Sequence, residues 1–229
     1  REELLRLNER LTGHRLLRGA VVPGGVTGPI VTASLPEAAT TVGKLVAEFV
    51  EITRLCLNNT TVLERLQGTG RLSPSTAAEM QGVGLVGRAR GVDADVRREA
   101  PVAAYGEVEV RVPLYETGDV WARTMVRIDE TREAARLICT TAQGTEEETR
   151  VPLPPFPAGT CAFGLVEAWR GPVWHWVRAD GPTSLDRVKV VDPSFRNWPA
   201  LEYAVLKNIV PDFPLCNKSF NLSYSGNDL

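Results

Sequence analysis

Residues 35–57 form the longest amphipathic stretch of the sequence, and they constrain the fold more than any other segment. Pro36 suits the first turn of a helix, and the hydroxyl of Ser34 can cap it. Apolar side chains then recur at the spacing of one helix face, at Val42, Leu45, Val46, Phe49, Ile52 and Cys56. Charged residues interrupt the stretch at Lys44, Glu48, Glu51 and Arg54. It therefore predicts a helix that packs on a protein core and does not cross a membrane.

Helix and strand patterns are segregated along the rest of the chain. Apolar periodicity predicts further helices over about 2–18, 119–142 and 199–208. Strict alternation predicts a strand over about 105–114, and shorter strands separated by glycine turns over about 163–191. Two segments are expected to be exposed connections, residues 23–29 and residues 146–157. The prediction is an α+β fold, in which long helices form a bundle core beside a small antiparallel β part.

Length and composition are those of an ordinary globular protein. The chain has 229 residues, of which 43% are hydrophobic, and its formal net charge is −2. We expect one domain over residues 1–229. The near balance of charge gives no support for binding to nucleic acid or to anionic lipid. The four cysteines are widely separated and contain no C-x-x-C pair, so no zinc or iron–sulfur ligand set is visible.

A glycine-rich loop at residues 82–87 reads G-V-G-L-V-G and allows two interpretations. A dinucleotide site needs this pattern after a strand and before a helix, where the pyrophosphate meets free amides. Here the preceding residues, 76–80, are predicted to be helical, and no clear helix follows. A packing turn is therefore favoured over a nucleotide site.

Other candidate chemical groups also have structural interpretations. His14 and His175 could each move a proton at neutral pH, but a hydrogen-bonded structural role is favoured for both. The arginines at 88, 90, 97 and 98 alternate with acidic residues, which favours a solvated or ion-paired loop over a ligand site. No G-x-S-x-G or H-E-x-x-H motif supports hydrolase chemistry. Residue patterns alone therefore leave the catalytic residues unknown.

Taken as whole segments, the sequence resembles the C-terminal portion of two related large subunits. One is that of complex-I-related, membrane-bound nickel–iron hydrogenases of the formate-hydrogenlyase type. The other is the quinone-site, forty-nine-kilodalton-type subunit of NADH:quinone oxidoreductase. The segments that carry the resemblance follow the order of the family and are residues 6–13, 23–26, 84–91, 118–127, 166–171, 187–195 and 212–215.

The resemblance also shows two departures from the hydrogenase pattern. The two C-terminal cysteines that hold nickel and iron in that family fall on Ser223 and Gly226. Because a hydroxyl is a poor ligand for these metals and glycine offers none, no nickel–iron centre is expected, and Cys216 is too distant in sequence to substitute. The N-terminal part of the family would precede Arg1, so we expect either a C-terminal portion or a shortened paralogue.

In the respiratory relative, the lost metal pocket has become part of a quinone cavity. The resemblance therefore implies that residues 214–228 border such a cavity, with Ser223, Tyr224, Ser225 and Asp228 nearest the quinone headgroup. Tyr224 would donate a hydrogen bond to a quinone oxygen, and Asp228 would relay protons. Electrons would come from an iron–sulfur cluster in a small partner subunit, and this chain would bind no cofactor of its own.

These expectations describe an oxidoreductase subunit attached through its partners to the cytoplasmic side of the inner membrane, and inactive when isolated. A non-catalytic scaffold, which keeps the fold for assembly after the metal site is lost, is the alternative. A nucleotide-binding domain that uses residues 82–87 is a third and weaker interpretation.

Overall fold

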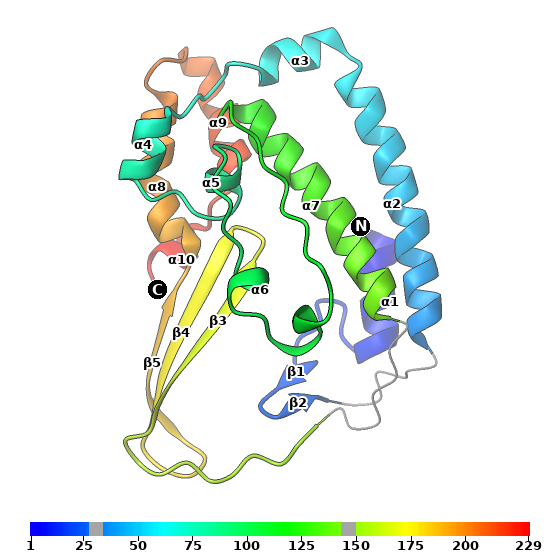
Figure 1. Cartoon of the computed structure of the whole chain (residues 1–229), viewed down its shortest axis with the longest axis vertical. Helices are drawn as coiled ribbons and strands as arrows, with labels where there is room; N and C mark the ends of the chain where they lie inside the picture. Colours follow the sequence, from blue (N-terminus) through cyan, green and yellow to red (C-terminus); the bar gives the residue numbers. More distant parts are fainter. Residues whose placement is uncertain (28–33, 143–149) are drawn as a thin grey trace. The chain divides into compact units, whose positions relative to one another are not determined.

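The computed structural model describes residues 1–27, 34–142 and 150–229, which form two compact units. Unit 1 contains residues 1–51 and 134–155, and unit 2 contains residues 52–133 and 156–229. Residues 28–29 and 146–149 of the two predicted connections lie outside the described residues. The helices and strands of each unit are labelled along the chain in Figure 1.

Unit 1 is built on helices. Helix α1 (Glu2–Thr12) is shorter than the predicted 2–18, because Gly13 adopts the left-handed conformation with φ +75° and ends it. A two-residue hairpin, β1 (Val21–Val22) with β2 (Gly25–Val26), follows. Helix α2 (Leu35–Leu57) confirms the predicted helix. A small core joins α1, α2 and the second half of the later helix α7, through Leu7, Ala38, Val42 and Ala135.

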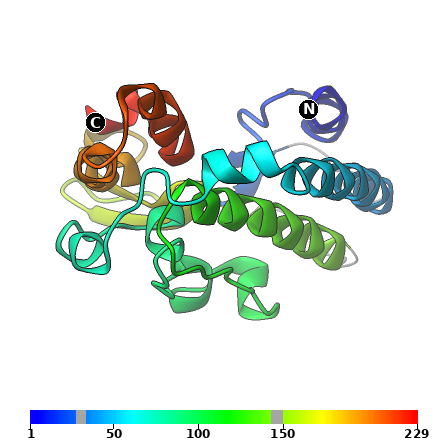
Figure 2. The same cartoon turned by 90° about the horizontal axis from the view of Figure 1, so that it is seen from above.

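Unit 2 gathers short helices around the N-terminal half of α7 (Val120–Thr141), whose bounds agree with the predicted 119–142. Figure 2 shows the unit from a second direction. The helices that precede α7 are α3 (Thr60–Leu66), α4 (Pro74–Glu79), α5 (Leu85–Arg88), α6 (Val96–Glu99) and the 3₁₀ turn η2 (Ala103–Gly106). Those near the C-terminus are α8 (Pro193–Val205), η3 (Val210–Asp212), α9 (Phe213–Phe220) and α10 (Tyr224–Asn227).

The C-terminal helices and α7 share the main hydrophobic core of unit 2. Its buried members include Leu72, Leu85, Val86, Val126, Leu201, Cys216 and Phe220. Helix α8 starts earlier than the predicted 199–208, because Asp192 caps it: a carboxylate oxygen accepts from the Ser194 amide at 2.7 Å. Among the described residues, no helix combines the length and the apolar character that a bilayer span requires.

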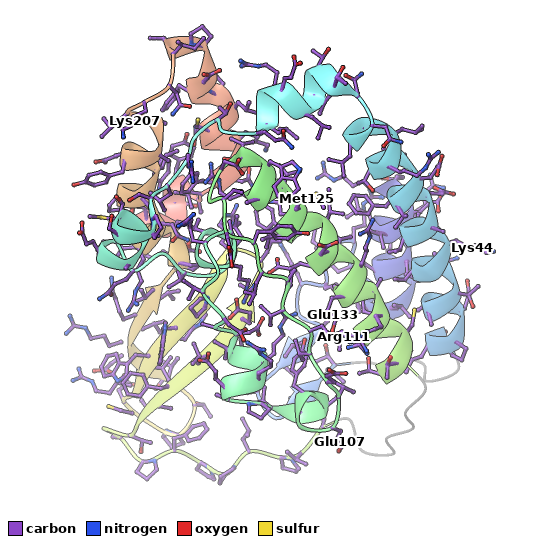
Figure 3. All side chains as sticks on the ribbon, turned by 45° about the horizontal axis from the view of Figure 1, so that its top comes forward. Lys44, Glu107, Arg111, Met125, Glu133 and Lys207 are labelled. Carbon is purple, nitrogen blue, oxygen red and sulfur yellow. The ribbon has the colours of Figure 1, made fainter. Side chains whose placement is uncertain are left out.

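The antiparallel sheet of unit 2 has the order β3 (Cys161–Ala168), β4 (Gly171–Ala179), β5 (Leu185–Val191). It confirms the strands predicted over 163–191. The strand predicted over 105–114 is wrong, because this segment is not a strand and pairs with none in the part of the chain that the structure describes. Val110 is buried, but the amide of Arg111 donates to a carboxylate oxygen of Glu133 at 2.9 Å, and both residues are labelled in Figure 3. The alternation thus marks an extended segment that lies against α7 without joining a sheet.

Candidate functional site

The C-terminal segment is held on the first turn of α8 by backbone and side-chain hydrogen bonds. Helix α9 ends where Asn221 adopts the left-handed conformation, with φ +51°. The amide of Ser223 then donates to the hydroxyl of Ser194 at 2.9 Å, and the hydroxyl of Ser223 accepts from the Gly226 amide at 2.9 Å. Ser223 is therefore the N-cap of α10, which is a structural use of its only side-chain oxygen.

Gly226 is buried against the carboxylate that caps α8. A Cβ atom at this position would lie 2.7 Å from Cγ of Asp192 and 2.9 Å from its Oδ2. The space for a side chain at position 226 is thus already filled. These residues do not fit a metal centre held by two thiolates, because neither position has sulfur and one has no room for it.

Replacing Gly226 by cysteine is expected to destabilise unit 2, by about 1–3 kcal/mol, since the new side chain must displace Asp192 or distort the cap. Urea denaturation followed by tryptophan fluorescence measures the change. Ser225→Cys is the matched control, because Ser225 is exposed and the effect should stay within about 0.5 kcal/mol. A Gly226→Cys variant as stable as the control would show that the space at 226 is larger than the structure indicates.

The other predicted polar residues lie at the surface. Tyr224 is 70% exposed; its hydroxyl accepts from the Asn217 side chain at 3.3 Å, and its ring centre lies 5.1 Å from that of Trp198. The hydroxyl of Ser225 is 3.3 Å from that of Ser223, and Asp228 is exposed beside Asn227. The structure therefore brings Ser223 and Ser225 together, while Tyr224 contacts α8 and α9.

A pocket of about 290 Å³ opens beside this segment, and the sequence reasoning did not single it out. It lies among the end of α3, one face of α7, helix α9 and the turn between β3 and β4. None of Ser223, Tyr224, Ser225 and Asp228 lines it. Its lining residues are Leu66, Val120, Thr124, Arg127, Trp169, Leu215, Lys218, Ser219 and Asn221. The sequence held no clear signal for it, because Arg127 shares its helix face with Thr124 and Thr131 and does not stand out.

Buried Arg123 ties the pocket's helices together. It donates to the hydroxyl of Ser219 at 2.9 Å and to the carbonyl oxygens of Gly118 and Gly70, each at 2.8 Å. Its guanidinium carbon lies 4.3 Å from the ring centre of Phe220. Burial lowers its pKa to about 9. Arg123 is therefore a positioning residue that fixes α9 against α7.

The predicted solvated or ion-paired loop has both characters. Arg88 and Arg97 belong to a buried ion cluster, whereas Arg98 pairs with Asp93 at the surface and Arg90 donates to the carbonyl oxygen of Glu116. Arg88 is 2% exposed and contacts Asp95 at 2.8 Å, Glu167 at 2.5 Å and Glu130. Arg97 contacts Asp95 at 2.6 Å. Burial raises the pKa of Glu167. Burial opposes ionisation of Asp95 too, but hydrogen bonds from Arg97 and the charge of Arg88 outweigh it and lower its pKa.

The glycine loop at residues 82–87 is a packing turn, as predicted. Gly84 has φ +57°, and a Cβ atom there would lie 2.3 Å from the carbonyl oxygen of Arg170. The Asn197 side chain exchanges hydrogen bonds with the backbone of Val83, at 3.1 and 3.2 Å. Helix α4 precedes the loop in place of a strand, and the adjoining cavity holds only about 90 Å³. This is far below the size of a dinucleotide site.

Of the two histidines, His14 has a hydrogen bond that fits the predicted structural role, whereas for His175 that role stays a prediction. His14 accepts from the Leu16 amide through Nδ1 at 3.0 Å, just after α1. His175 is exposed on β4, opposite Gly164. Neither lies beside a group that it could activate, within the contacts that the structure describes.

Comparison with known proteins identifies the family. Residues 1–152 match the respiratory-chain NADH dehydrogenase, 49 Kd subunit. The carbon monoxide-induced hydrogenase of Rhodospirillum rubrum is 33% identical over 75% of this chain and 48% of its own length. Formate hydrogenlyase subunit 5 of Escherichia coli is 29% identical over the whole chain and 40% of its own. NADH-quinone oxidoreductase subunit 4 of Thermus thermophilus is 29% identical over 93% of this chain and 59% of its own.

A solved structure extends the likeness to the fold. A chain of the membrane-bound sulfane sulfur reductase, described as an archaeal respiratory membrane complex, superposes with a TM-score of 0.89. It is 28% identical, and the match covers all of this chain and 64% of that one. The present chain spans about half the length of the curated relatives it matches. It belongs to the family of the respiratory-chain NADH dehydrogenase, 49 Kd subunit, and is also similar to the carbon monoxide-induced hydrogenase and to formate hydrogenlyase subunit 5.

Proposed function

We propose that this chain serves as a subunit of a membrane-bound, complex-I-like or hydrogenase-like electron-transfer complex. In this proposal residues 214–228 form part of a cavity wall at the place where hydrogenases hold nickel and iron. The observation that carries it is Gly226, whose side-chain space is filled by Asp192 although the fold of the family is retained. A cavity wall that lacks the two thiolates suits an organic electron acceptor, such as a quinone, better than a soft metal ion.

The exposed groups of the segment supply the chemistry that a quinone needs. The phenol of Tyr224 can donate to a carbonyl oxygen, and the carboxylate of Asp228 can pass on a proton. Electrons would arrive from an iron–sulfur cluster in a small partner subunit. Attachment to the cytoplasmic side of the membrane would be made through the partners.

The three-stranded sheet supports a role inside an assembly. It leaves large apolar side chains exposed on both faces, a pattern typical of surfaces that contact other proteins. The exposed fraction is 75% for Phe163, 54% for Leu185, 53% for Val188, 51% for Val166 and 42% for Trp174. A non-catalytic scaffold would use the same surface, so the quinone test below must separate the two.

Photoaffinity labelling of the assembled complex with a quinone analogue tests the proposal. We expect label in the peptide that covers residues 214–229, and we expect excess quinone to reduce it. Tyr224→Phe should lower the labelling several-fold, whereas Tyr203→Phe, at another exposed tyrosine, should not. A complex that assembles with no label in this peptide would favour the scaffold. Stoichiometric nickel in the purified complex, bound to residues 216–229, would contradict both.

A further inference from the structure

The pocket of about 290 Å³ combines an apolar floor with a cationic rim. Val120, Thr124 and Arg127 lie on one face of α7, at the spacing of successive helix turns. Leu215 and Lys218 face them from α9. Leu66 and Trp169 add further apolar surface, and Ser219 and Asn221 add polar groups, so that most of the exposed wall surface is apolar. A mostly apolar pocket with a few convergent polar groups is the usual form of a small-molecule site.

The cations at this pocket lack acidic partners. Arg127 donates to the carbonyl oxygens of Phe220, at 3.1 Å, and Arg123, at 3.3 Å. Arg170 donates to the carbonyl of Asn221 at 2.5 Å, and Lys218 donates to the Asn221 side chain at 2.9 Å. Within the described ranges, none of these three cations forms an ion pair with a carboxylate.

Holding this positive charge is costly for the folded chain. Burial, together with the smaller effect of the neighbouring charge of Arg170, lowers the pKa of Arg127 to about 10. Glu130 acts in the opposite direction, but its carboxylate pairs with Arg88. A bound anion would offset this cost, because it would supply the missing counter-charge in a partly desolvated site.

Trp169 extends the apolar part of the site to its mouth. The side chain is 47% exposed, and the guanidinium carbons of Arg127 and Arg170 lie 5.1 and 4.9 Å from its ring centre. An exposed indole held by two arginines offers a rigid apolar surface directly beside positive charge. The lining has no carboxylate, thiol or imidazole, so it lacks the usual side-chain ligands of a transition metal.

We propose that this pocket binds a small amphiphilic anion. Arg127 and Lys218 hold its phosphate or carboxylate headgroup, and its apolar body lies along Leu66, Val120, Leu215 and Trp169. The pocket shares residues such as Leu215 and Lys218 with the segment 214–228, but none of Ser223, Tyr224, Ser225 and Asp228 lines it, so the assignment does not depend on the quinone proposal. The same headgroup chemistry occurs in free acyl or alkyl anions and in membrane lipids, so the experiment below includes both sources.

Isothermal titration of the 229-residue chain with decyl phosphate, below its micelle concentration, tests the proposal. We expect one site per chain, and binding at least about tenfold weaker for decanol, which lacks the charge, and for inorganic phosphate, which lacks the apolar body. Equal affinity for decanol and decyl phosphate would overturn the anionic assignment. Equal affinity for inorganic phosphate would overturn the amphiphilic one.

Lys218→Gln should weaken decyl phosphate binding about tenfold, because it removes one charged donor at the exposed rim. Lys207→Gln is the matched control: Lys207 is an exposed lysine after α8, outside the pocket lining, and is labelled in Figure 3. Replacing Arg127 would also remove its hydrogen bonds to two backbone carbonyls, so Trp169→Leu is chosen as the second variant. It too should weaken decyl phosphate binding. Equal binding by Lys218→Gln and wild type would place the anion elsewhere.

Vesicles of phosphatidylglycerol identify the source of the headgroup. Sedimentation of wild type, but not of Lys218→Gln, with these vesicles would support a lipid headgroup as the natural ligand. Binding of monomeric decyl phosphate without sedimentation would support a free amphiphile. Sedimentation of both proteins to the same extent, without decyl phosphate binding, would overturn the site.

Discussion

Replacing Arg88 by methionine is expected to lower the free energy of unfolding of unit 2 by about 3–5 kcal/mol, the range for a buried charge left without its partner. The side chains of Asp95, Glu167 and Glu130 are 0%, 4% and 14% exposed, and all three contact Arg88. Methionine keeps most of the apolar stem but removes the cation. Arg97 would then be the only described cation in contact with Asp95, and the two glutamates would lose theirs.

Arg98→Met provides the matched control, because Arg98 pairs with Asp93 at the surface, where the two side chains are 35% and 53% exposed. Its effect should stay below about 1 kcal/mol. All five tryptophans lie in unit 2, so their fluorescence in a urea titration reports this unit. Adding Glu167→Gln to Arg88→Met should recover part of the lost free energy of unfolding. Burial raises the pKa of Glu167, so removing its charge relieves an unfavourable desolvation. A loss no larger than that of the control would contradict the buried cluster.

The elements that the sequence predicted well are those whose pattern is local. Residues 35–57 and 119–142 each repeat apolar side chains at a helical period over several turns, and both form helices with nearly those bounds. The strand predicted over 105–114 failed because alternation shows only that one face is buried. Whether a partner strand is present depends on distant residues. Here Glu133 of α7 bonds the amide of Arg111, where a strand would otherwise be.

The candidate site also has one part that the sequence could predict and another that it could not. Ser223 and Gly226 could be singled out from the family pattern of the C-terminal segment. The sequence could not show that Asp192 fills the space at position 226, because this contact joins positions far apart in the chain. The rim of the pocket is likewise assembled from α7, α9 and the β3–β4 turn. Arg127, Trp169 and Lys218 each resemble ordinary surface residues until the fold brings them together.

Gly84→Ala is expected to destabilise unit 2 by about 3–5 kcal/mol. The new side chain both strains the backbone of residue 84 and clashes with backbone atoms that cannot move away. Gly84 has φ +57° and ψ −133°, a region essentially closed to residues with a side chain. The new Cβ would also lie 2.3 Å from the carbonyl oxygen of Arg170 and 2.5 Å from Cα of Gly171. Arg170 lies in the turn between β3 and β4, and Gly171 is the first residue of β4, so the substitution separates the helical loop from the sheet.

Gly68→Ala is a control for backbone strain without a clash. Gly68 has φ +73°, but a Cβ atom there would meet nothing within 4 Å, so only conformational strain of about 1–2 kcal/mol is expected. The larger loss expected for Gly84→Ala in urea titrations then reports the clash together with the greater strain of the Gly84 conformation. Equal losses would mean that the loop and the sheet are not in contact.

NADH should leave the midpoint of wild-type unfolding unchanged, because the amides of a loop this closely packed are not free to meet a pyrophosphate. A stabilisation by NADH that Gly84→Ala removes while remaining folded would instead revive the nucleotide-binding interpretation of residues 82–87.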